Sequence, residues 1–561
     1  MASSTSKKPR QRGKSKQTDK AIPDPTVSEE ELRKYYASNR RSRLIIFAIC
    51  VLFRLGNASV TRTYDNPDEY WQAQEVAHRL VFGYPFLKYI SFAHPLIFAA
   101  LYKVLQILRL EDTAFFVTAP RYLESILAAT ADFYIYNLAK KTVGDNIAPS
   151  VLFCTLASFF NFHMAGRTLS NSLEMVLTTV ALNYWPLDGV VIFNNSDWIG
   201  NFRVALAWAA LACVIRPTNA LLWGFLGLRL LYKAWPYRSV IIANTAIVLI
   251  TSMTFATVLD TWCYDGHLGN LLTEPVFTPG KFFELNVVSA ISMFYGIHSW
   301  HWYLSQGIPV VLAGLLPAFL FGWYRIGKDA ILNERVTSLK QLIIWTVVVY
   351  SLLAHKEFRF IYPIVPIMHI IAAYGISQLP TRWRKWIVLS MLSLNISLGL
   401  YTTTTHQRGV MDAVEWVRME AMELRRQYTE YDMEVAFLMP CHSTPWQSIM
   451  HDNNTKAWFL TCEPPLAKNS EDYKDEADRF YEDPTAFIKE RILSSSSKKS
   501  PTQIIAFDSL LQMPSQDNEN IGSFLRDRGG YVECQRFFNS HFHDDWRRTG
   551  DVIILCHSDN Q

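Results

Sequence analysis

The run SVIIANTAIVLITSMTFATVL at residues 239–259 decides the fold class, because it carries no charged side chain. A helix needs about 20 apolar residues to cross a hydrocarbon layer of roughly 30 Å. Comparable or slightly shorter runs lie near residues 44–60, 92–109, 121–138, 147–163, 173–187, 204–232, 303–323, 341–354, 361–378 and 386–402, of which 204–232 reads as one broken span or two short ones. These runs are continuously apolar and do not alternate. They therefore predict a polytopic α-helical membrane protein and not a barrel.

Charge divides the chain into three parts. Residues 1–43 hold 12 basic and 5 acidic side chains, only 44 of the 358 residues at 44–401 are charged, and residues 402–561 hold 17 basic and 26 acidic side chains. We predict a disordered basic tail, a multi-span transmembrane domain and a small α+β domain, in that order. The basic excess lies in a tail and in short loops, which argues against a nucleic-acid partner. The tail lacks the apolar core of a cleaved signal peptide.

The basic loops predict the orientation in the membrane. Lys233–Arg238, Arg325–Lys340 and Arg382–Lys385 are separated by pairs of apolar runs and should share the cytosolic side with the tail. The far side then holds residues 61–91, 260–302, 355–360 and everything after 402. The number of crossings between residues 92 and 232 must be odd, whereas six apolar runs lie there. We therefore expect one of those runs not to cross completely.

The last 160 residues suggest strands at Glu434–Met439, Gln503–Phe507 and Val552–Cys556, and a helix near 410–428. Four cysteines in a non-cytosolic domain predict one or two disulfides, with three possible pairings for two bonds; buried free thiols are the alternative. These are Cys441, Cys462, Cys534 and Cys556. None has the C-x2-C spacing of a zinc site. Among the Asn-x-Ser/Thr sites, we expect only Asn453 to accept a glycan.

The segment DNPDEYWQAQEVAH at 65–78 is the first candidate site. Asp68 and Glu69 are adjacent carboxylates near the predicted membrane surface, where either could act as general base on a hydroxyl. Tyr70 and Trp71 could form a stacking wall for a sugar, and Gln72 and Glu75 are weaker substrate-binding candidates. The alternative is a solvated acidic loop with interfacial aromatic residues.

The segment HKEFRF at 355–360 is the second candidate and lies on the same predicted side. His355, Lys356 and Arg359, with Glu357 among them, could bind a lipid-linked phosphate and stabilise it as a leaving group. The alternative is that Lys356 and Arg359 only extend to the interface from a span end. A base and a phosphate-binding group on one side favour sugar transfer from a lipid phosphate.

Three further arginines, Arg121, Arg167 and Arg216, lie at or inside apolar runs, where a charge is costly and often functional. Each could instead pair with a neighbour such as Glu124 or Glu174. The sequence has no P-loop, no G-x-G-x-x-G after a strand and no D-x-D. A soluble nucleotide-sugar donor is therefore disfavoured.

Several long motifs resemble the membrane mannosyltransferases of glycosyltransferase family 22. They are DNPDEYWQAQEVAH, RTLSNSLEMVLTTVALNYWP at 167–186, RPTNA at 216–220, FELNVVSAISMFYGIHSWHWYLSQGIPVVL at 283–312, HKEFRFIYPIVPI at 355–367 and LMPCHSTPWQS at 438–448. FLTCEPPL at 459–466, DEADRFYEDP at 475–484 and HFHDDWRRTGDV at 541–552 are similar to the branch that builds the GPI anchor.

The resemblance implies a GT-C fold in the endoplasmic reticulum membrane, with its active site at the luminal face. It implies transfer of the third mannose, through an inverting α-1,2 linkage, from dolichyl-phosphate mannose to the GPI glycolipid precursor. Asp68 is the preferred base over Glu69, and Lys356 and Arg359 would stabilise the departing phosphate. We expect membrane lipids as surroundings, and no metal or cofactor.

The chain departs from the family pattern in the first loop. Phe82-Gly83-Tyr84 reaches His94-Pro95 about a dozen residues early. Either the acceptor pocket is altered or the sequence reflects an imperfect gene model or splice form. Two rival functions are a sister mannosyltransferase of the N-glycan lipid precursor, with the same fold and donor, and a membrane transporter. A transporter would gain nothing from the acidic loop and the polar C-terminal domain, and inverted repeats are not visible.

Overall fold

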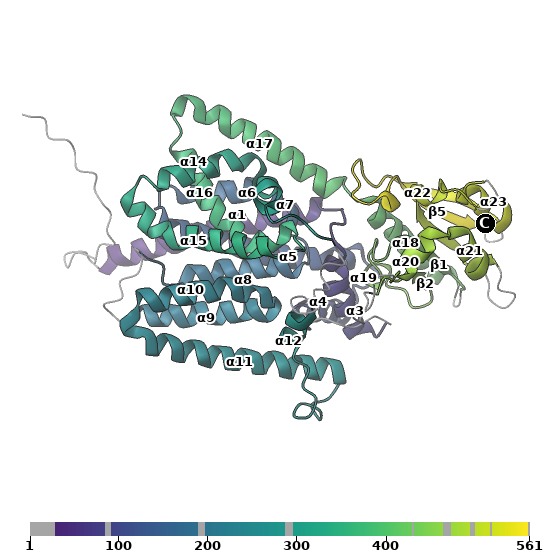
Figure 1. The fold of residues 1–561 in the computed structure, drawn as a ribbon, viewed down its shortest axis with the longest axis horizontal. Coiled ribbons are helices and arrows are strands. Elements are labelled where there is room, and N and C mark those ends of the chain that lie inside the picture. The colour runs from purple at the N-terminus through teal and green to yellow at the C-terminus, as the bar shows by residue number, and fades with distance from the viewer. Residues whose placement is uncertain are drawn as a thin grey trace, which may run out of the picture. The chain divides into compact units, whose positions relative to one another are not determined.

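The computed structural model describes residues 29–84, 91–188, 197–285, 296–428, 431–463, 473–493, 500–515 and 519–558. Its transmembrane region consists of α1 (Glu29–Val60), α4 (Pro95–Ile107), α5 (Ala114–Thr142), α6 (Ala148–Ala157), α7 (Phe159–Met164), α8 (Ser170–Tyr184), α9 (Asp197–Ile215), α10 (Ala220–Lys233), α11 (Arg238–Asp265), α12 (Thr278–Phe283), α13 (Ile308–Leu312), α14 (Leu316–Ile326), α15 (Ala330–Leu352), α16 (Val365–Ser377) and α17 (Thr381–Thr404) (Figure 1). Within the described ranges, six helical segments are long and apolar enough to cross a membrane. The prediction of a polytopic helical membrane protein is confirmed.

The apolar runs between residues 92 and 232 form helices of unequal length. The pairs α5 and α8, α8 and α9, and α5 and α6 pack together. The run at 147–163 is broken at Ser158, whose side chain accepts a hydrogen bond from the Asn161 amide and starts α7. The run at 204–232 consists of two helices, which separate at Arg216-Pro217. The 13-residue α4, about 20 Å long, packs on α3 (Glu75–Phe82) of the first loop. Among the described helices of this stretch, Asp197–Ile215 is a candidate span by length and composition, and Pro95–Ile107 and Ala148–Ala157 are shorter apolar helices.

Helix α1 begins at Glu29, inside the segment expected to be disordered. The residues from Glu29 to Arg43 include several good helix formers and no proline or glycine, so nothing local stops the helix. The rest of the predicted tail lies outside the described residues. The same holds for residues 85–90 of the shortened loop and residues 286–295 of the quoted motif at 283–312.

The C-terminal domain, residues 402–561, contains a five-stranded sheet with the order β2-β1-β3-β5-β4. Its strands are β1 (Glu434–Leu438), β2 (Lys456–Phe459), β3 (Gln503–Phe507), β4 (Tyr531–Phe537) and β5 (Val552–His557), and its helices are α18 (Gly409–Gln427), α19 (Gln447–Met450), α20 (Glu476–Glu482), α21 (Pro484–Ile488), α22 (Asp508–Leu511) and α23 (Ile521–Gly529). The pairs β1–β2 and β1–β3 are parallel, and β3–β5 and β4–β5 are antiparallel. The three expected strands and the helix near 410–428 are confirmed.

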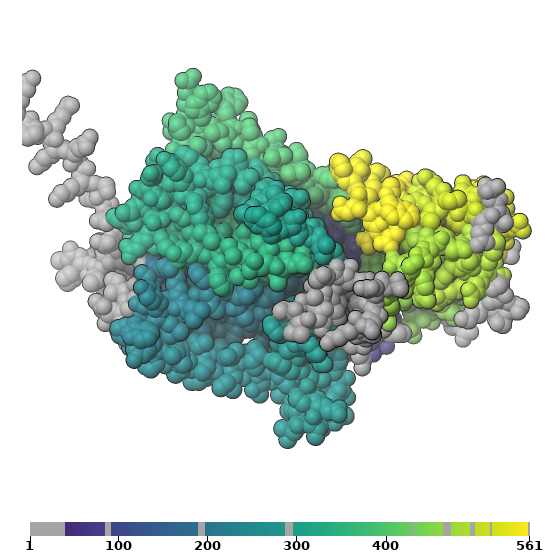
Figure 2. Space-filling view, viewed as in Figure 1, coloured from purple at the N-terminus to yellow at the C-terminus, as the bar shows by residue number. Residues whose placement is uncertain are grey.

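Alternation along the strands gives the sheet two apolar faces. Val435, Phe437, Ile505 and Ile554 pack on one face with α18 and with Tyr64, Tyr70 and Trp71 of the first loop. Ala436, Ile504 and Leu555 pack on the other face, together with α20, α21 and α23. Figure 2 shows the surface of the C-terminal domain in light green to yellow. The first loop is therefore part of the core of this domain.

The disulfide prediction is confirmed. Cys441 bonds to Cys462, and Cys534 bonds to Cys556. Cys50, Cys154, Cys213 and Cys263 of the transmembrane region are free. The glycan candidate Asn453 is exposed.

Candidate functional site

The first loop carries Asp68 on a helix whose start is fixed by the sequence N-P-D-E. The Asn66 side chain accepts a hydrogen bond from the Asp68 amide at 3.0 Å, and Pro67 occupies the first position of α2 (Pro67–Glu69). An Asn cap, a proline at the first position and acidic residues in the first turn are the residues that favour a helix N-terminus. A π-helical turn, Tyr70–Gln74, joins α2 to α3. Asp68 therefore projects from a defined helical end.

Asp68 is the accessible carboxylate of the acidic pair. Its Oδ2 lies 2.7 Å from Arg359 Nη2, and its Oδ1 accepts a hydrogen bond from Gln72 Nε2 at 2.5 Å. The Asp68 side chain is 28% exposed. The structure thus brings together the two segments, 65–78 and 355–360, that the sequence nominated separately.

Glu69 has the opposite environment. Its side chain is fully buried, with Oε2 3.0 Å from Arg167 Nη1 and Oε1 3.8 Å from Arg121 Nε. Thr168 also donates a hydrogen bond to the Glu69 carbonyl at 2.6 Å. Glu69 balances two buried arginines, and removing one partner of such a pair leaves an uncompensated charge.

The segment 355–360 places Arg359 between two carboxylates. Arg359 Nε lies 2.6 Å from Glu357 Oε2, and His355 Nε2 lies 3.1 Å from Glu357 Oε1. Burial disfavours the ionised form of Glu357, but Arg359 and His355 outweigh burial and lower the pKa of Glu357 to about 2. Arg359 Nη1 is buried and has no hydrogen-bond partner among the described residues. The guanidinium is therefore held in place with one nitrogen unused.

Lys356 is placed differently. Its Nζ donates hydrogen bonds to the backbone carbonyls of His298, at 3.0 Å, and Leu353. The part of the chain that the structure describes shows no contact between Lys356 and Asp68. Lys356 fastens the 355–360 segment to residues 296–302 in this structure.

Asp65 and His163 belong to the same site and were not singled out in the sequence. Asp65 Oδ1 lies 2.8 Å from His163 Nε2, and 28% of the Asp65 side chain is exposed. Burial opposes ionisation of Asp65, but His163, Arg167 and Arg359 hold its pKa well below its usual range. Asp65 is the first residue of the DNPDE motif, three positions before Asp68. Its place in this motif could have identified it as a site residue from the sequence. His163 lies in an apolar run, and no sequence pattern marks it as a site residue.

The weaker candidates pack against protein. Tyr70 accepts a hydrogen bond from Arg121 Nη2 at 2.6 Å and stacks on Tyr64, and the Trp71 indole donates to the Thr444 carbonyl at 2.9 Å. Tyr70 and Trp71 are 1% and 8% exposed, so their rings are covered by neighbouring side chains. Glu75 accepts hydrogen bonds from the C-terminal domain.

Among the intramembrane arginines, the expected pairing with Glu174 is found only for Arg216. Arg216 Nε lies 3.1 Å from Glu174 Oε2, and its guanidinium lies 6.0 Å from the Phe360 ring centroid. Arg121 pairs with Glu69 and not with Glu124, whose carboxylate oxygens have no hydrogen-bond partner among the described residues. Arg216 is thus next to the 355–360 segment, while Arg121 and Arg167 support the first loop.

Comparison with known proteins shows that this membrane protein is a glycosyltransferase. The Alg9-like mannosyltransferase family matches residues 45–451, and the chain belongs to that family. It is 38% identical over 552 residues to the GPI mannosyltransferase 3 of Yarrowia lipolytica, covering 94% of this chain and 99% of that protein. It is 34% identical over 516 residues to the GPI alpha-1,2-mannosyltransferase 3 of Mus musculus, covering 91% of this chain and 88% of the mouse protein.

A solved structure shows the same fold. The crystal structure of ArnT from Cupriavidus metallidurans bound to undecaprenyl phosphate superposes with a TM-score of 0.54 at 11% identity, covering 91% of this chain and 97% of that chain. The GT-C fold expected from the sequence is confirmed. Membership of the mannosyltransferase family also displaces the transporter hypothesis.

Proposed function

We propose that this protein transfers the third mannose, through an α-1,2 linkage, from dolichyl-phosphate mannose to the GPI glycolipid precursor at the luminal face of the endoplasmic reticulum. The names of the yeast and mouse relatives support this acceptor and this linkage. The observation that carries the proposal is the 2.7 Å contact between Asp68 and Arg359. It joins a partly exposed base to a cation whose Nη1 has no partner in the part of the chain that the structure describes.

The reaction is a single displacement. A hydroxyl oxygen of the acceptor attacks C1 of the mannose, the bond between C1 and the phosphate oxygen breaks, and the bonding electrons leave with dolichyl phosphate. Asp68 takes the proton of the attacking hydroxyl. Attack opposite the β-linked phosphate gives an α-linked product, so the anomeric carbon inverts. No acid is needed because the phosphate leaves as an anion.

Arg359 is the group assigned to the donor phosphate. We assign its Nη1, which is buried and has no hydrogen-bond partner among the described residues, to a phosphate oxygen of the bound donor, while Glu357 holds Nε and Nη2. Prepositioned donors at the place where charge develops are the strongest contributors to such transfers. His355 orients Glu357 and so supports Arg359. Lys356 acts by fixing the segment, since its amino group contacts backbone carbonyls.

The proposal uses no metal ion or cofactor. Asp68 is balanced by Arg359, Asp65 by His163, and Glu69 by Arg167, so each carboxylate already has a cationic or potentially cationic partner. The basic loops support a cytosolic N-terminus and a luminal C-terminal domain, with membrane lipids around the helices.

The test is incorporation of labelled mannose into GPI intermediates in cells lacking this enzyme and complemented with wild type, Asp68→Asn or Glu69→Gln. Asp68→Asn should accumulate a two-mannose intermediate. Full rescue by Asp68→Asn would overturn the assignment of the base. Transfer by microsomes to the N-glycan lipid precursor, and not to the GPI precursor, would favour the sister enzyme.

A further inference from the structure

The C-terminal domain touches the first loop on both sides of Asp68. The touching segment, residues 440–448, is here named the contact loop. The Tyr64 hydroxyl donates to the His442 carbonyl at 2.6 Å, and the Trp71 indole donates to the Thr444 carbonyl at 2.9 Å. Tyr64 precedes Asp68 by four residues and Trp71 follows it by three. The backbone that carries the base is thus bound to the C-terminal domain at two points.

Glu75 provides the third and most extensive connection. Its Oε1 accepts from the Trp446 amide at 2.9 Å and from the Ser448 hydroxyl at 2.5 Å, and its Oε2 accepts from the Ser448 amide at 3.0 Å. The side chain is 2% exposed. These donors lie at the start of α19, where backbone N–H groups have no partner within the helix. Both carboxylate oxygens of Glu75 therefore bind the contact loop.

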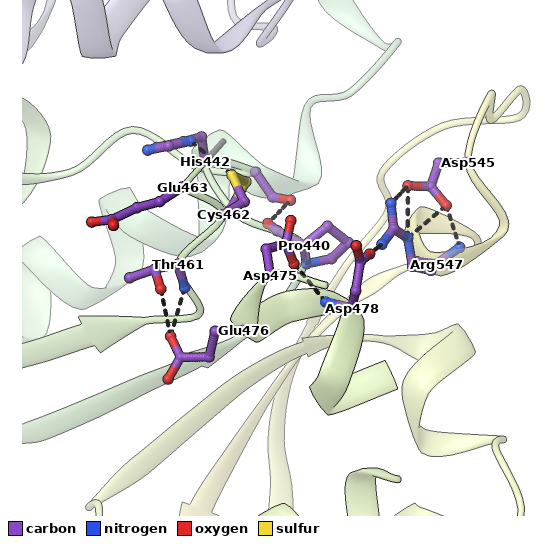
Figure 3. The surroundings of a disulfide bond; sticks show 12 residues. Pro440, His442, Thr461, Cys462, Glu463, Asp475, Glu476, Asp478, Asp545 and Arg547 are labelled. Carbon is purple, nitrogen blue, oxygen red and sulfur yellow. Dashed lines mark hydrogen bonds and ion pairs between the residues drawn. A yellow bond between two sulfur atoms is a disulfide. The ribbon is translucent and has the colours of Figure 1, made fainter. Parts of the chain in front are cut away.

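The contact loop is itself fastened. Cys441 is bonded to Cys462, which follows β2, and the Ser443 hydroxyl donates to the Pro440 carbonyl at 2.5 Å. In Figure 3 the His442 ring points away from the ion pairs that Arg547 makes with Asp478 and Asp545. It packs instead on Trp71, with 4.4 Å between ring centroids.

The backbone is unusual at one residue of the contact loop and at the residue that follows α19. His442 has a φ of 53° and His451, just after α19, has a φ of 48°, a region that residues other than glycine rarely adopt. Such conformations persist where the surroundings impose them, and they gather at functional sites. His451 Nδ1 also lies 2.8 Å from His78 Nε2, which extends the contact along α3.

We propose that Glu75 is a positioning residue through which the C-terminal domain sets the place of Asp68, and that the Cys441–Cys462 bond holds the contact loop for this purpose. The inference rests on the proposed function and gives the C-terminal domain a role in it. Asp68 depends on geometry: a misplacement of about 1 Å at a reacting group lowers the rate by about 100-fold. Loosening the contact loop should therefore reduce turnover more than it reduces substrate binding.

The chain offers matched controls. Cys534–Cys556 closes a loop of nearly the same size, with a separation of 22 residues against 21, but it joins β4 to β5 at the other edge of the sheet. Glu533 is an exposed glutamate that pairs with Arg536 on β4. The test variants are Glu75→Gln and Cys441→Ser/Cys462→Ser, and the controls are Glu533→Gln and Cys534→Ser/Cys556→Ser.

Two measurements on full-length protein in detergent decide the matter. Hydrogen–deuterium exchange of residues 64–75 should rise in both test variants and remain at the wild-type level in both controls. In transfer assays the test variants should lose about 10- to 100-fold in kcat with less than about threefold change in KM for the donor. The proposal is overturned if residues 64–75 of Glu75→Gln exchange at the wild-type rate. It is also overturned if the variant differs from wild type in KM and not in kcat.

The two proposals fail separately. The exchange measurement needs no mannose transfer, so it judges the positioning role even if Asp68→Asn is active and the assigned reaction is wrong. If the cysteine variant does not fold, Glu75→Gln alone decides, because it leaves the disulfide intact.

Discussion

The carboxylate of Asp68 and the guanidinium of Arg359 lie 2.7 Å apart, although they come from the first loop and from the start of the segment that leads into α16. The same guanidinium is bound by Glu357, and its Nη1 has no hydrogen-bond partner within the described ranges. This arrangement lets one arginine connect the group that receives a proton with the place where a phosphate departs.

The two carboxylates of the acidic pair should respond differently to amide substitution. Asp68→Asn should lower transfer by at least about 100-fold, the range of general-base catalysis, and leave thermal stability near that of wild type. Glu69→Gln should destabilise the protein, by about 3–5 kcal/mol if Arg167 is left uncompensated. Mannose incorporation and thermal unfolding in detergent measure the two effects. If Asp68→Asn and Glu69→Gln lost equal activity and neither variant lost stability, the assignment of a catalytic role to Asp68 and a structural role to Glu69 would be contradicted.

Arg359 should be sensitive even to a conservative change. Arg359→Ala should lower kcat by about 10²- to 10³-fold. Arg359→Lys should recover little of this, because a lysine amino group cannot bind Glu357 through two nitrogens and Asp68 at once. Steady-state kinetics with a water-soluble donor analogue measures the loss. Wild-type kcat in Arg359→Lys would show that a point charge suffices.

Stability should depend on pH through Glu75. Burial raises the pKa of Glu75 to about 7 from an ordinary 4.5, although its hydrogen bonds with Ser448 and Trp446 oppose the rise. A raised pKa means that the folded state binds the proton more tightly, so this contribution to stability is complete below pH 4.5 and is lost as pH rises through about 7. We expect the melting temperature of wild type to fall between about pH 5 and pH 8 more steeply than that of Glu75→Gln.

Two neighbouring histidines should not obscure that measurement. Burial lowers the pKa of His451 to about 4 and that of His78 well below its usual range. Neither should titrate in the window where Glu75 does. If the melting temperatures of wild type and Glu75→Gln fell equally with pH, the pH dependence could not be assigned to Glu75.

Asn453 reports the orientation of the C-terminal domain. It is exposed, and a luminal location makes it a glycan acceptor. Endoglycosidase treatment should increase the gel mobility of wild type and leave Asn453→Gln unchanged. The control is Asn395→Gln, because Asn395 is 1% exposed and its side chain bonds to the backbone of Phe159 and Met391. We expect the glycan on Asn453 and not on Asn395. This expectation is wrong if Asn453→Gln still shifts on endoglycosidase treatment and Asn395→Gln does not.

The sequence predicted what depends on local pattern. Continuous apolar runs, long in helices and short in buried strands, are visible within a window of the sequence, which is why α11, β1 and β3 were predicted. Strand β4 was missed because its pairing with β5 is shifted between Glu533 and Gln535, which interrupts the alternation, and because it carries charged residues. Strand β2 has only four residues.

In the candidate site, too, local sequence patterns predicted some features, and others depend on packing. Motif residues such as Asp68 and Arg359 were predicted, whereas their partners depend on how helices pack. Arg121 could reach Glu124 along its own helix, yet it pairs with Glu69 of the first loop. The pair Asp65–His163 joins a loop to α7, and no local pattern encodes such a contact.

The π-helical turn between α2 and α3 has a consequence for how insertions and deletions act here. Such a turn accommodates one surplus residue within a helix, and each residue of an α-helix turns the chain by about 100°. Deleting a single residue between Tyr70 and Gln74 would convert the π-helical turn into a regular α-helical turn and leave Asp68 and Glu75 close to their present phase around the axis, whereas deleting a second residue would rotate one against the other by about that angle. This short stretch should therefore tolerate the loss of one residue, which the π-helical turn absorbs, but not the loss of two.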